Sequence, residues 1–145
     1  MGRTHALERL QTLGLQGDDV SLAELIPAVE MAWADGEVQP NERAVLEAYA
    51  QSLVETLPAP PGGRRLTLAR ALAWLTQWTR RRLAPHERRQ ALESVRLLSA
   101  HPGGAAMRKR VVEWCEAVAA VDGSPVWDAR EVLWLQRVRA TLDLA

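Results

Sequence analysis

This chain of 145 residues has a single cysteine, no long continuous apolar run and no leader-like pattern in its first residues. The single cysteine, Cys115, excludes an intramolecular disulfide framework and favours a reducing compartment. No run approaches the ~18 apolar residues that a transmembrane helix requires. Residues 1–15 carry Arg3, Glu8 and Arg9 and hold no continuous apolar stretch, so they predict neither a secretory signal nor a membrane anchor. We therefore expect a soluble, cytoplasmic protein.

Motifs of familiar catalytic sites are missing as well. The histidines His5, His86 and His101 lie far apart in the sequence, and neither a glycine-rich phosphate loop nor a Gly-x-Ser-x-Gly elbow occurs. Cys115 has apolar neighbours such as Val118, and burial in such surroundings raises rather than lowers the pKa of a thiol. The sequence therefore predicts a protein that is not an enzyme.

Phenylalanine is absent and tyrosine occurs once, whereas tryptophan occurs six times. Such a chain must fill its core with other large side chains. Because Trp33 and Trp114 fall on apolar stripes, we expect the tryptophans to pack in the core. Two alternatives stay open: Trp74 and Trp78, one helical turn apart, could form a ligand cage, and Trp127 could cover a turn or mark a contact surface.

Apolar residues recur at helical spacing along most of the chain, and no alternating strand pattern occurs. The expected helices cover residues 21–34, 40–57, 66–83, 85–100, 105–121 and 128–144, with a short one at 4–13. We predict an all-α bundle that forms a single domain over residues 1–145. Residues 1–20 are then an N-terminal extension, and the proline- and glycine-rich residues 58–64 link two helix-loop-helix halves.

Two signals conflict at the start of the first long helix. Ser21 followed by Glu24 makes a capping box, which predicts a helix from Ser21 to Ala34. Pro27 would fall in the second turn of that helix, where a proline removes a hydrogen bond. We therefore expect Pro27 to shift the true start of the helix or to kink its entry.

One sequence motif occurs twice, because residues 32–42 recur in outline as residues 119–131. Each copy has an alanine-rich helix end, an Asp-Gly pair that begins at Asp35 or at Asp122, and a glutamate near the start of the next helix. The glycine supplies the positive φ that ends a helix sharply, and the aspartate can accept backbone N–H groups within the turn. A duplicated helical hairpin is the simplest interpretation.

The helix that follows each turn carries its own capping signals. In the first copy Gln39 occupies the N-cap position and Glu42 can reach back to the N-cap amide. In the second copy Asp128 is a strong N-cap and Glu131 completes an Asp-x-x-Glu box. These carboxylates therefore have a structural interpretation, in which aspartate braces the turn and glutamate caps the helix.

The acidic turns also have a chemical interpretation. Two carboxylates together with turn carbonyls and water are suitable ligands for a hard cation such as Ca²⁺ or Mg²⁺. The candidate metal ligands are Asp35, Glu37, Glu42, Asp122, Asp128 and Glu131. Neither turn has the spacing of an EF-hand, so any cation is expected to bind weakly.

Two more acidic residues precede the turns. Glu30 and Glu116 lie near the ends of the helices before the Asp-Gly pairs. We expect both to be solvated, and an inward orientation that adds them to the acidic turns is the alternative. If the two halves pack about a pseudo-two-fold axis, the two turns approach one another.

The pattern from Ala34 to Val38 with Glu42, present in stretched form around Asp122, resembles the TerB-like domain of tellurite-resistance proteins and the central domain of the DjlA-type co-chaperone. The resemblance covers nearly the whole chain. It implies an all-helical, pseudo-duplicated fold of about seven helices, acidic positions proposed to chelate a divalent cation, and no established enzymatic activity. It further implies a setting in bacterial stress response with membrane-associated partners. A metal-free interaction scaffold, akin to the co-chaperone domain, is the alternative.

Charge is balanced overall but divided along the chain. Residues 1–63 hold 3 basic and 10 acidic residues, residues 64–110 hold 12 and 2, and residues 111–145 hold 3 and 6. The segment net charges of −7, +10 and −3 sum to the overall value of zero. The basic middle carries the candidate anion-binding residues Arg80, Arg81, Arg82, Arg88 and Arg89.

Three interpretations of the basic middle compete. Zero net charge and the absence of a helix-turn-helix, zinc ligands or an aromatic-basic sheet argue against a dedicated nucleic-acid reader. Docking on an anionic membrane surface is a second interpretation, since clustered arginines favour such lipids. In the third, the arginines pair with the acidic segments, within one chain or in a homodimer. We expect a binding module with a protein partner.

Overall fold

The structure is a computed structural model that describes residues 8, 10–11, 14–15, 17–34, 36–56, 67–100, 104–121 and 129–142. These residues are all-helical and contain no strand. The elements are a 3₁₀ helix η1 (Gly17–Leu25) and the α-helices α2 (Ile26–Trp33), α3 (Pro40–Thr56), α4 (Leu68–Arg80), α5 (Pro85–Leu98), α6 (Gly104–Ala120) and α7 (Ala129–Thr141). The all-α prediction is thus confirmed for the described part of the chain.

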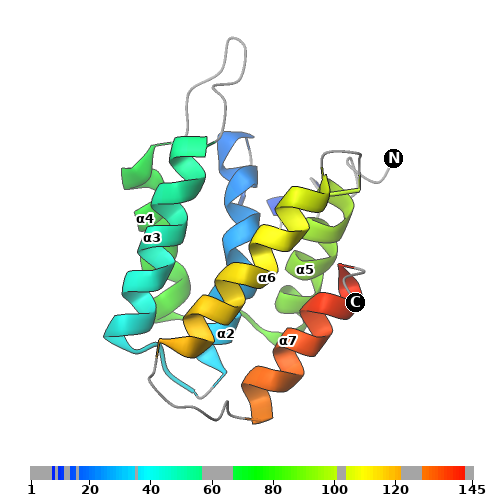
Figure 1. Ribbon diagram of the computed structural model, residues 1–145. Coiled ribbons are helices and arrows are strands. Elements are labelled where there is room, and N and C mark those ends of the chain that lie inside the picture. Colours follow the sequence, from blue (N-terminus) through cyan, green and yellow to red (C-terminus); the bar gives the residue numbers. More distant parts are fainter. Residues whose placement is uncertain are drawn as a thin grey trace.

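The short helix α2 lies at the centre of the bundle. It contacts η1 and each of the helices α3 to α7. In Figure 1, α3 and α4 pack as a pair on one side, α5 and α7 lie on the other, and α6 crosses obliquely over α2. Helix α2 is therefore surrounded by protein, and any polar side chain on it has to find a partner inside the fold.

The start of α2 shows how the two conflicting signals are resolved. Residues 17–25 form the 3₁₀ helix η1, and the α-helix begins only at Ile26. Pro27 then lies in the first turn, where no intrahelical hydrogen bond needs its missing N–H group. The shift expected from Pro27 is confirmed, and the predicted start at Ser21 is wrong because residues 21–25 belong to η1.

The other helix starts follow the sequence closely. The Thr67 hydroxyl accepts a hydrogen bond of 3.2 Å from the backbone N–H of Arg70 at the start of α4. Pro85 opens α5, and the Glu87 carboxylate accepts from the backbone N–H of Ala84 at 2.9 Å. Of the helix expected over 4–13, residues 8, 10 and 11 are described and are helical. The predicted linker 58–64 lies outside the described residues.

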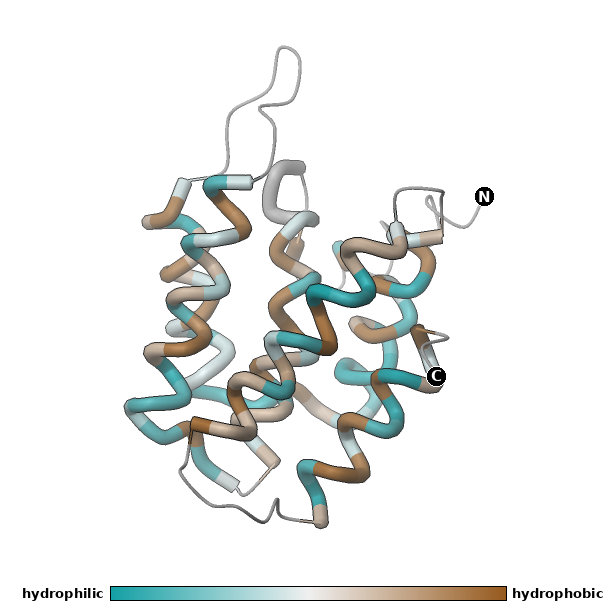
Figure 2. The backbone as a smooth tube through the Cα atoms, viewed as in Figure 1, coloured by the Kyte–Doolittle hydropathy of each residue, from teal (hydrophilic) through white to brown (hydrophobic). Residues whose placement is uncertain are grey.

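The core forms around α2, where every residue from Ile26 to Ala32 is buried. Hydrophobic and hydrophilic residues alternate along α6 and α7, as amphipathic helices require (Figure 2). Cys115 on α6 is fully buried, and this burial raises the pKa of its thiol. The prediction that Cys115 packs in the core is confirmed.

The tryptophans contribute to this core as expected. Trp78 is buried, and the core packs against four partly buried tryptophans, Trp33, Trp74, Trp114 and Trp134. The Trp33 Nε1–H donates to the backbone oxygen of Trp78 at 2.9 Å. Trp127 lies outside the described residues.

Candidate functional site

The first acidic turn has the geometry that the sequence predicts. Gly36 has a φ of +100°, a left-handed conformation that favours glycine, and its N–H donates to the Trp33 carbonyl at 2.8 Å. Glu42 is buried at the start of α3, and its Oε1 accepts from the backbone N–H of Gln39 at 2.8 Å. Glu42 therefore caps its helix. Exposed Glu37 accepts from the Gln39 side-chain amide.

The segments that flank the two turns lie close together at one end of the bundle. The Asn41 side-chain amide, at the start of α3, donates to the backbone oxygen of Val121 at 2.9 Å. Val121 follows the last residue of α6, so the bond joins segments 80 positions apart in the sequence. Figure 1 shows the same proximity between the start of α3 and the end of α6. The flanks of the two turns are therefore close together, and the approach of the turns themselves stays a prediction.

The cation hypothesis stays a prediction. Asp35, Asp122 and Asp128 lie outside the described residues. Glu131 is buried in the first turn of α7, as Glu42 is in α3. Within the described ranges, no group of three or more histidine, cysteine, aspartate or glutamate side chains is placed to hold a metal ion.

The five arginines of the basic cluster lie in three different environments. Arg82, in the segment between α4 and α5, and Arg88, on α5, both reach Glu30 on the central helix. The Arg82 Nε lies 3.3 Å from Glu30 Oε2, and an Arg88 Nη lies 3.5 Å from the same oxygen. Arg80 and Arg81 are exposed and line neither of the two pockets described below. The pairing interpretation therefore applies to two of the five.

Arg89 belongs to a different surface from Arg82 and Arg88. It lines a separate pocket of about 620 Å³ between α5 and α7, together with His86 and Glu93. Arg137 of α7 also lines this pocket. The basic cluster of the sequence is therefore spread over two neighbouring surfaces of the folded protein.

Glu30 is buried, with an exposed fraction of 1%, and the expectation that it is solvated is wrong. The reason is the position of α2, which is surrounded by other helices. Burial raises the pKa of the Glu30 carboxyl, and the charges of Arg88 and then Arg82 offset only part of this effect. Glu116, in contrast, is partly exposed and accepts from Arg139 at 2.6 Å.

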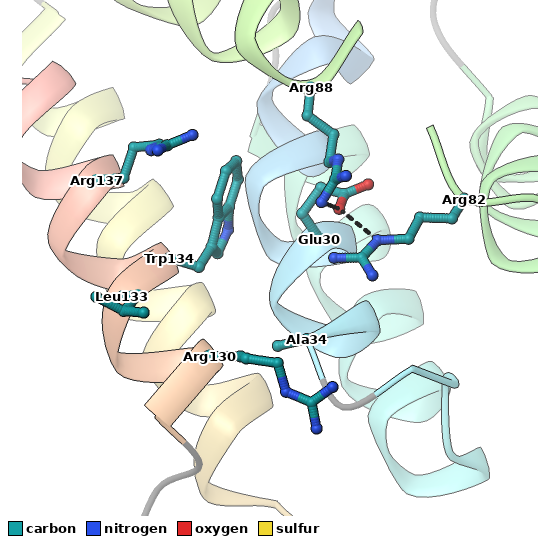
Figure 3. Close-up of a pocket in the computed structure, with 8 residues that line it drawn as sticks. All are labelled: Glu30, Ala34, Arg82, Arg88, Arg130, Leu133, Trp134 and Arg137. Atoms are coloured by element: carbon teal, nitrogen blue, oxygen red, sulfur yellow. Dashed lines mark hydrogen bonds and ion pairs between the residues drawn. The ribbon is translucent and has the colours of Figure 1, made fainter. Parts of the chain in front are cut away.

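A pocket of about 220 Å³ opens beside Glu30, between α2, α5 and α7. In Figure 3, Arg82 and Arg88 lie against the Glu30 carboxylate, whereas the Trp134 ring lies between Glu30 and Arg137 in this view and Arg130 lies nearer to Ala34. The indole N–H of Trp134 donates to the Pro27 carbonyl at 2.8 Å, which fixes the ring against α2. The lining residues are Glu30, Ala34, Arg82, Arg88, Arg130, Leu133, Trp134 and Arg137.

Two of the residues that line this pocket each have one buried polar atom without a hydrogen-bond partner within the described residues. One is Oε1 of Glu30, an acceptor, and the other is Nε of Arg88, a donor. Buried polar groups are rarely left without partners, because each missing bond costs free energy. Such atoms in residues that line an open pocket mark a candidate binding site.

A second buried glutamate provides the contrast. Glu24 on η1 is 2% exposed, and its Oε1 accepts from Arg110 of α6 at 2.6 Å. Its Oε2 accepts from Arg110 Nε and, at 2.7 Å, from the Tyr49 hydroxyl of α3. The Tyr49 ring stacks on Trp114 at a centroid distance of 4.8 Å. Glu24 therefore ties three elements together, and its predicted role in a capping box is wrong.

Sequence reasoning missed half of the pocket. Arg130 and Arg137 lie on α7, more than 40 positions from Arg82 and Arg88, so no local cluster marks them. The available signal was weak: Arg130, Trp134 and Arg137 recur at spacings of four and three, which places them on one helix face. Only the packing of α7 against α2 and α5 brings this face to Glu30.

Comparisons with protein-family models, with curated proteins and with solved structures find no match for this chain. The TerB-like resemblance therefore stays a prediction. Among the residues that the structure describes, no helix combines the length and apolar character needed to cross a bilayer. Function has to be argued from the site itself.

Proposed function

We propose that this protein is a non-enzymatic binding module that holds an anionic group of a partner in the pocket beside Glu30. The observation that carries the proposal is the charge of the lining. Among the lining residues that the structure describes, Arg82, Arg88 and Arg137 accompany one carboxylate, that of Glu30, and Arg130 adds a fourth guanidinium. Positive charge therefore exceeds negative charge in a partly enclosed site.

The guanidinium groups suit an anion in both chemistry and position. Arginine stays charged and presents several donors in a planar fork that matches carboxylate and phosphate oxygens. Arg82 and Arg88 are held by Glu30, so part of the cost of ordering their long side chains is met before a ligand arrives. The fixed Trp134 ring and Ala34 form an apolar side of the site, and charges beside apolar groups interact more strongly than in bulk water.

Burial of Glu30 is hard to explain by stability alone. An ion pair taken out of water gains little unless its geometry is excellent and its remaining hydrogen bonds are made. At Glu30 both arginine contacts are long and reach the same oxygen. This arrangement supports a role in binding rather than in holding the fold together.

The edge of the pocket supports a protein partner as the bearer of the anionic group. Leu133 lines the pocket and is 64% exposed, and its neighbour Val132 is exposed as well. An apolar patch beside basic groups is complementary to a partner segment that carries an anionic group next to an apolar side chain. A partner segment of this kind is the ligand we propose for the intact surface.

Calorimetric titration with inorganic phosphate tests whether the pocket binds anions at all. We expect saturable binding by the wild-type chain and a loss of roughly tenfold in affinity for Arg137→Gln, since one charged hydrogen bond is removed. Arg81→Gln is the matched control, because it removes the same charge outside the pocket. Absence of binding by the wild type, or an equal loss in both variants, contradicts the proposal.

A weakly bound divalent cation at the Asp-Gly turns is the second function that we propose, in line with the TerB-like resemblance. The Asn41 to Val121 hydrogen bond favours it, because this bond holds the flanks of the two turns together. Titration with Ca²⁺ and Mg²⁺ should produce heat that is lost in the Asp35→Asn, Asp122→Asn double variant. No heat at millimolar metal leaves these turns with a purely structural role.

A further inference from the structure

The partners missing at the pocket are of opposite kinds. Glu30 Oε1 is an acceptor that requires a donor, and Arg88 Nε–H is a donor that requires an acceptor. Both atoms are buried, and both residues line the same pocket. A ligand that satisfies the two must carry an oxygen that accepts and a hydrogen that donates, within the reach of one small site.

This requirement separates anions by their protonation. Sulfate and an ionised carboxylate offer acceptors only, so they satisfy Arg88 but leave Glu30 Oε1 facing another negative oxygen. A cation could satisfy Glu30 but would meet the arginines that line the pocket. An oxyanion that retains a proton meets both requirements, because its O–H group donates and its other oxygens accept.

The directions of the arginines favour a tetrahedral group. Arg82 comes from the segment between α4 and α5, Arg88 from α5, and Arg137 from α7 (Figure 3). A tetrahedral oxyanion presents oxygens in several directions, whereas a planar carboxylate or bicarbonate presents them in one plane. Hydrogen phosphate is the oxyanion that combines this shape with a proton at neutral pH.

We infer that the pocket is selective for a protonated phosphate group, whose O–H donates to Glu30 Oε1 while its other oxygens accept from Arg88 and from the neighbouring arginines. The inference rests on the proposed anion-binding function and specifies its ligand. Free hydrogen phosphate and a singly protonated phosphate monoester share this chemistry. They differ near neutral pH, because a monoester loses its last proton at a pH of about 6 whereas inorganic phosphate keeps one.

The charged groups around Glu30 give the selectivity a dependence on pH. Within the described part of the chain, those that line its pocket are Arg82 before α5, Arg88 on α5, and Arg130 and Arg137 on α7, without a second acid. Burial raises the pKa of Glu30, so this carboxyl can itself supply the proton when the anion has none. Binding of sulfate then requires proton uptake from solvent and weakens as the pH rises. Binding of hydrogen phosphate does not require that uptake.

Calorimetry with three probes tests the inference: inorganic phosphate, sulfate and glycerol phosphate. Near neutral pH, we expect the wild-type chain to bind inorganic phosphate roughly tenfold or more tightly than sulfate, since sulfate leaves a buried acceptor opposed by charge. Glycerol phosphate should resemble sulfate near neutral pH and approach inorganic phosphate below its pKa of about 6. Tight binding of the ester throughout would assign the site to esters and overturn the role given to the ligand proton.

The Glu30→Gln variant is the specific control. Its neutral amide can donate an N–H to sulfate, so we expect the phosphate preference to fall to within about twofold. Should this variant fail to fold, the wild type still provides the test, because its sulfate affinity must fall with rising pH while its phosphate affinity persists. Equal affinities for phosphate and sulfate in the wild type would overturn the inference and leave anion binding intact. No binding of either anion would overturn the proposed function as well.

Discussion

Two buried glutamates, six positions apart in the sequence, are bonded in different ways. Glu24 uses both carboxylate oxygens, which accept from Arg110 and from the Tyr49 hydroxyl at distances of 2.5 to 2.7 Å. Glu30 uses one oxygen, which lies 3.3 Å from Arg82 and 3.5 Å from Arg88. Its other oxygen has no partner within the described residues.

The difference separates a structural ion pair from a binding site. The hydrogen bonds around Glu24 replace those that its carboxylate loses on leaving water, and they join η1, α3 and α6. Around Glu30, protein hydrogen bonds replace only part of those that the carboxylate loses on leaving water, and a pocket lies beside this residue. A buried charged group therefore indicates a binding site when one of its atoms lacks a hydrogen-bond partner and an adjacent pocket has room for a ligand that supplies it.

Removing Arg110 from the hydrogen-bonded cluster around Glu24 should have the largest effect on stability. Arg110→Met keeps much of the side-chain volume but leaves the Glu24 carboxylate buried without its cation, which costs about 3 kcal/mol in unfolding free energy. Urea denaturation measures this loss. Arg82→Met is the matched change at Glu30 and should cost less than about 1 kcal/mol, because Arg82 is partly exposed and its contact is long. Equal losses would remove the distinction between the two clusters.

Removing the hydroxyl from the same cluster should have the next largest effect. Tyr49→Phe keeps the ring that stacks on Trp114 but deletes a hydrogen bond to a buried carboxylate, at a cost of about 2 kcal/mol. The midpoint of urea unfolding should fall with an unchanged slope. A variant as stable as the wild type would show that Arg110 alone satisfies Glu24.

The pH dependence of stability distinguishes Glu30 from an ordinary ion pair. Its pKa in the folded protein is raised above the value of 4.5 for an unperturbed glutamate, so the folded state holds this proton more tightly than the unfolded state does. As pH rises from about 4.5 through the folded pKa, ionisation of Glu30 lowers the unfolding free energy.

The Glu30→Gln variant isolates this contribution. A glutamine does not titrate, so the stability of the variant relative to the wild type should increase over that pH window and then level off. Urea denaturation of both proteins across the window measures the difference. A relative stability that decreases with rising pH would mean that the arginines lower the pKa of Glu30 by more than burial raises it.

The smallest effect on stability is expected at the edge of the pocket. Arg137 is exposed and forms no hydrogen bond or ion pair within the described residues, so Arg137→Gln should change the unfolding free energy by less than about 0.5 kcal/mol. The same variant should still bind phosphate more weakly. A stability loss as large as that of Tyr49→Phe would place Arg137 in the structural framework.

Much of the fold follows from local sequence features. Apolar periodicity predicts the helices from α3 to α7, and proline or threonine marks the starts of α3, α4 and α5. The positive φ of Gly36 and the cap made by Glu42 are equally local, and both predictions are confirmed. These features depend on neighbours within one helical turn, which a sequence displays directly.

The site depends on contacts between distant segments, and the sequence could not predict it. Arg82 and Arg88 belong to the predicted basic cluster, but Glu30 lies 52 positions from Arg82 and was expected in water. Its burial follows from the central position of α2, which depends on how all the helices pack. The error at Glu24 has the same origin, since Arg110 lies 86 positions away. A local pattern describes a polar residue by its neighbours in the sequence, whereas tertiary packing decides whether that residue is buried and which partner it meets.

The most direct test of the account is to observe Arg88 while phosphate binds. The Nε–H resonance of Arg88, assigned by its loss in Arg88→Lys, can be followed in ¹H–¹⁵N spectra during titration with inorganic phosphate. We predict a saturable shift of this resonance as its missing acceptor arrives, with a much smaller response to sulfate near neutral pH. In this account, the unpartnered atoms of Glu30 and Arg88 form the binding site. Failure of phosphate to bind, or binding of phosphate without a shift of this resonance, would contradict it.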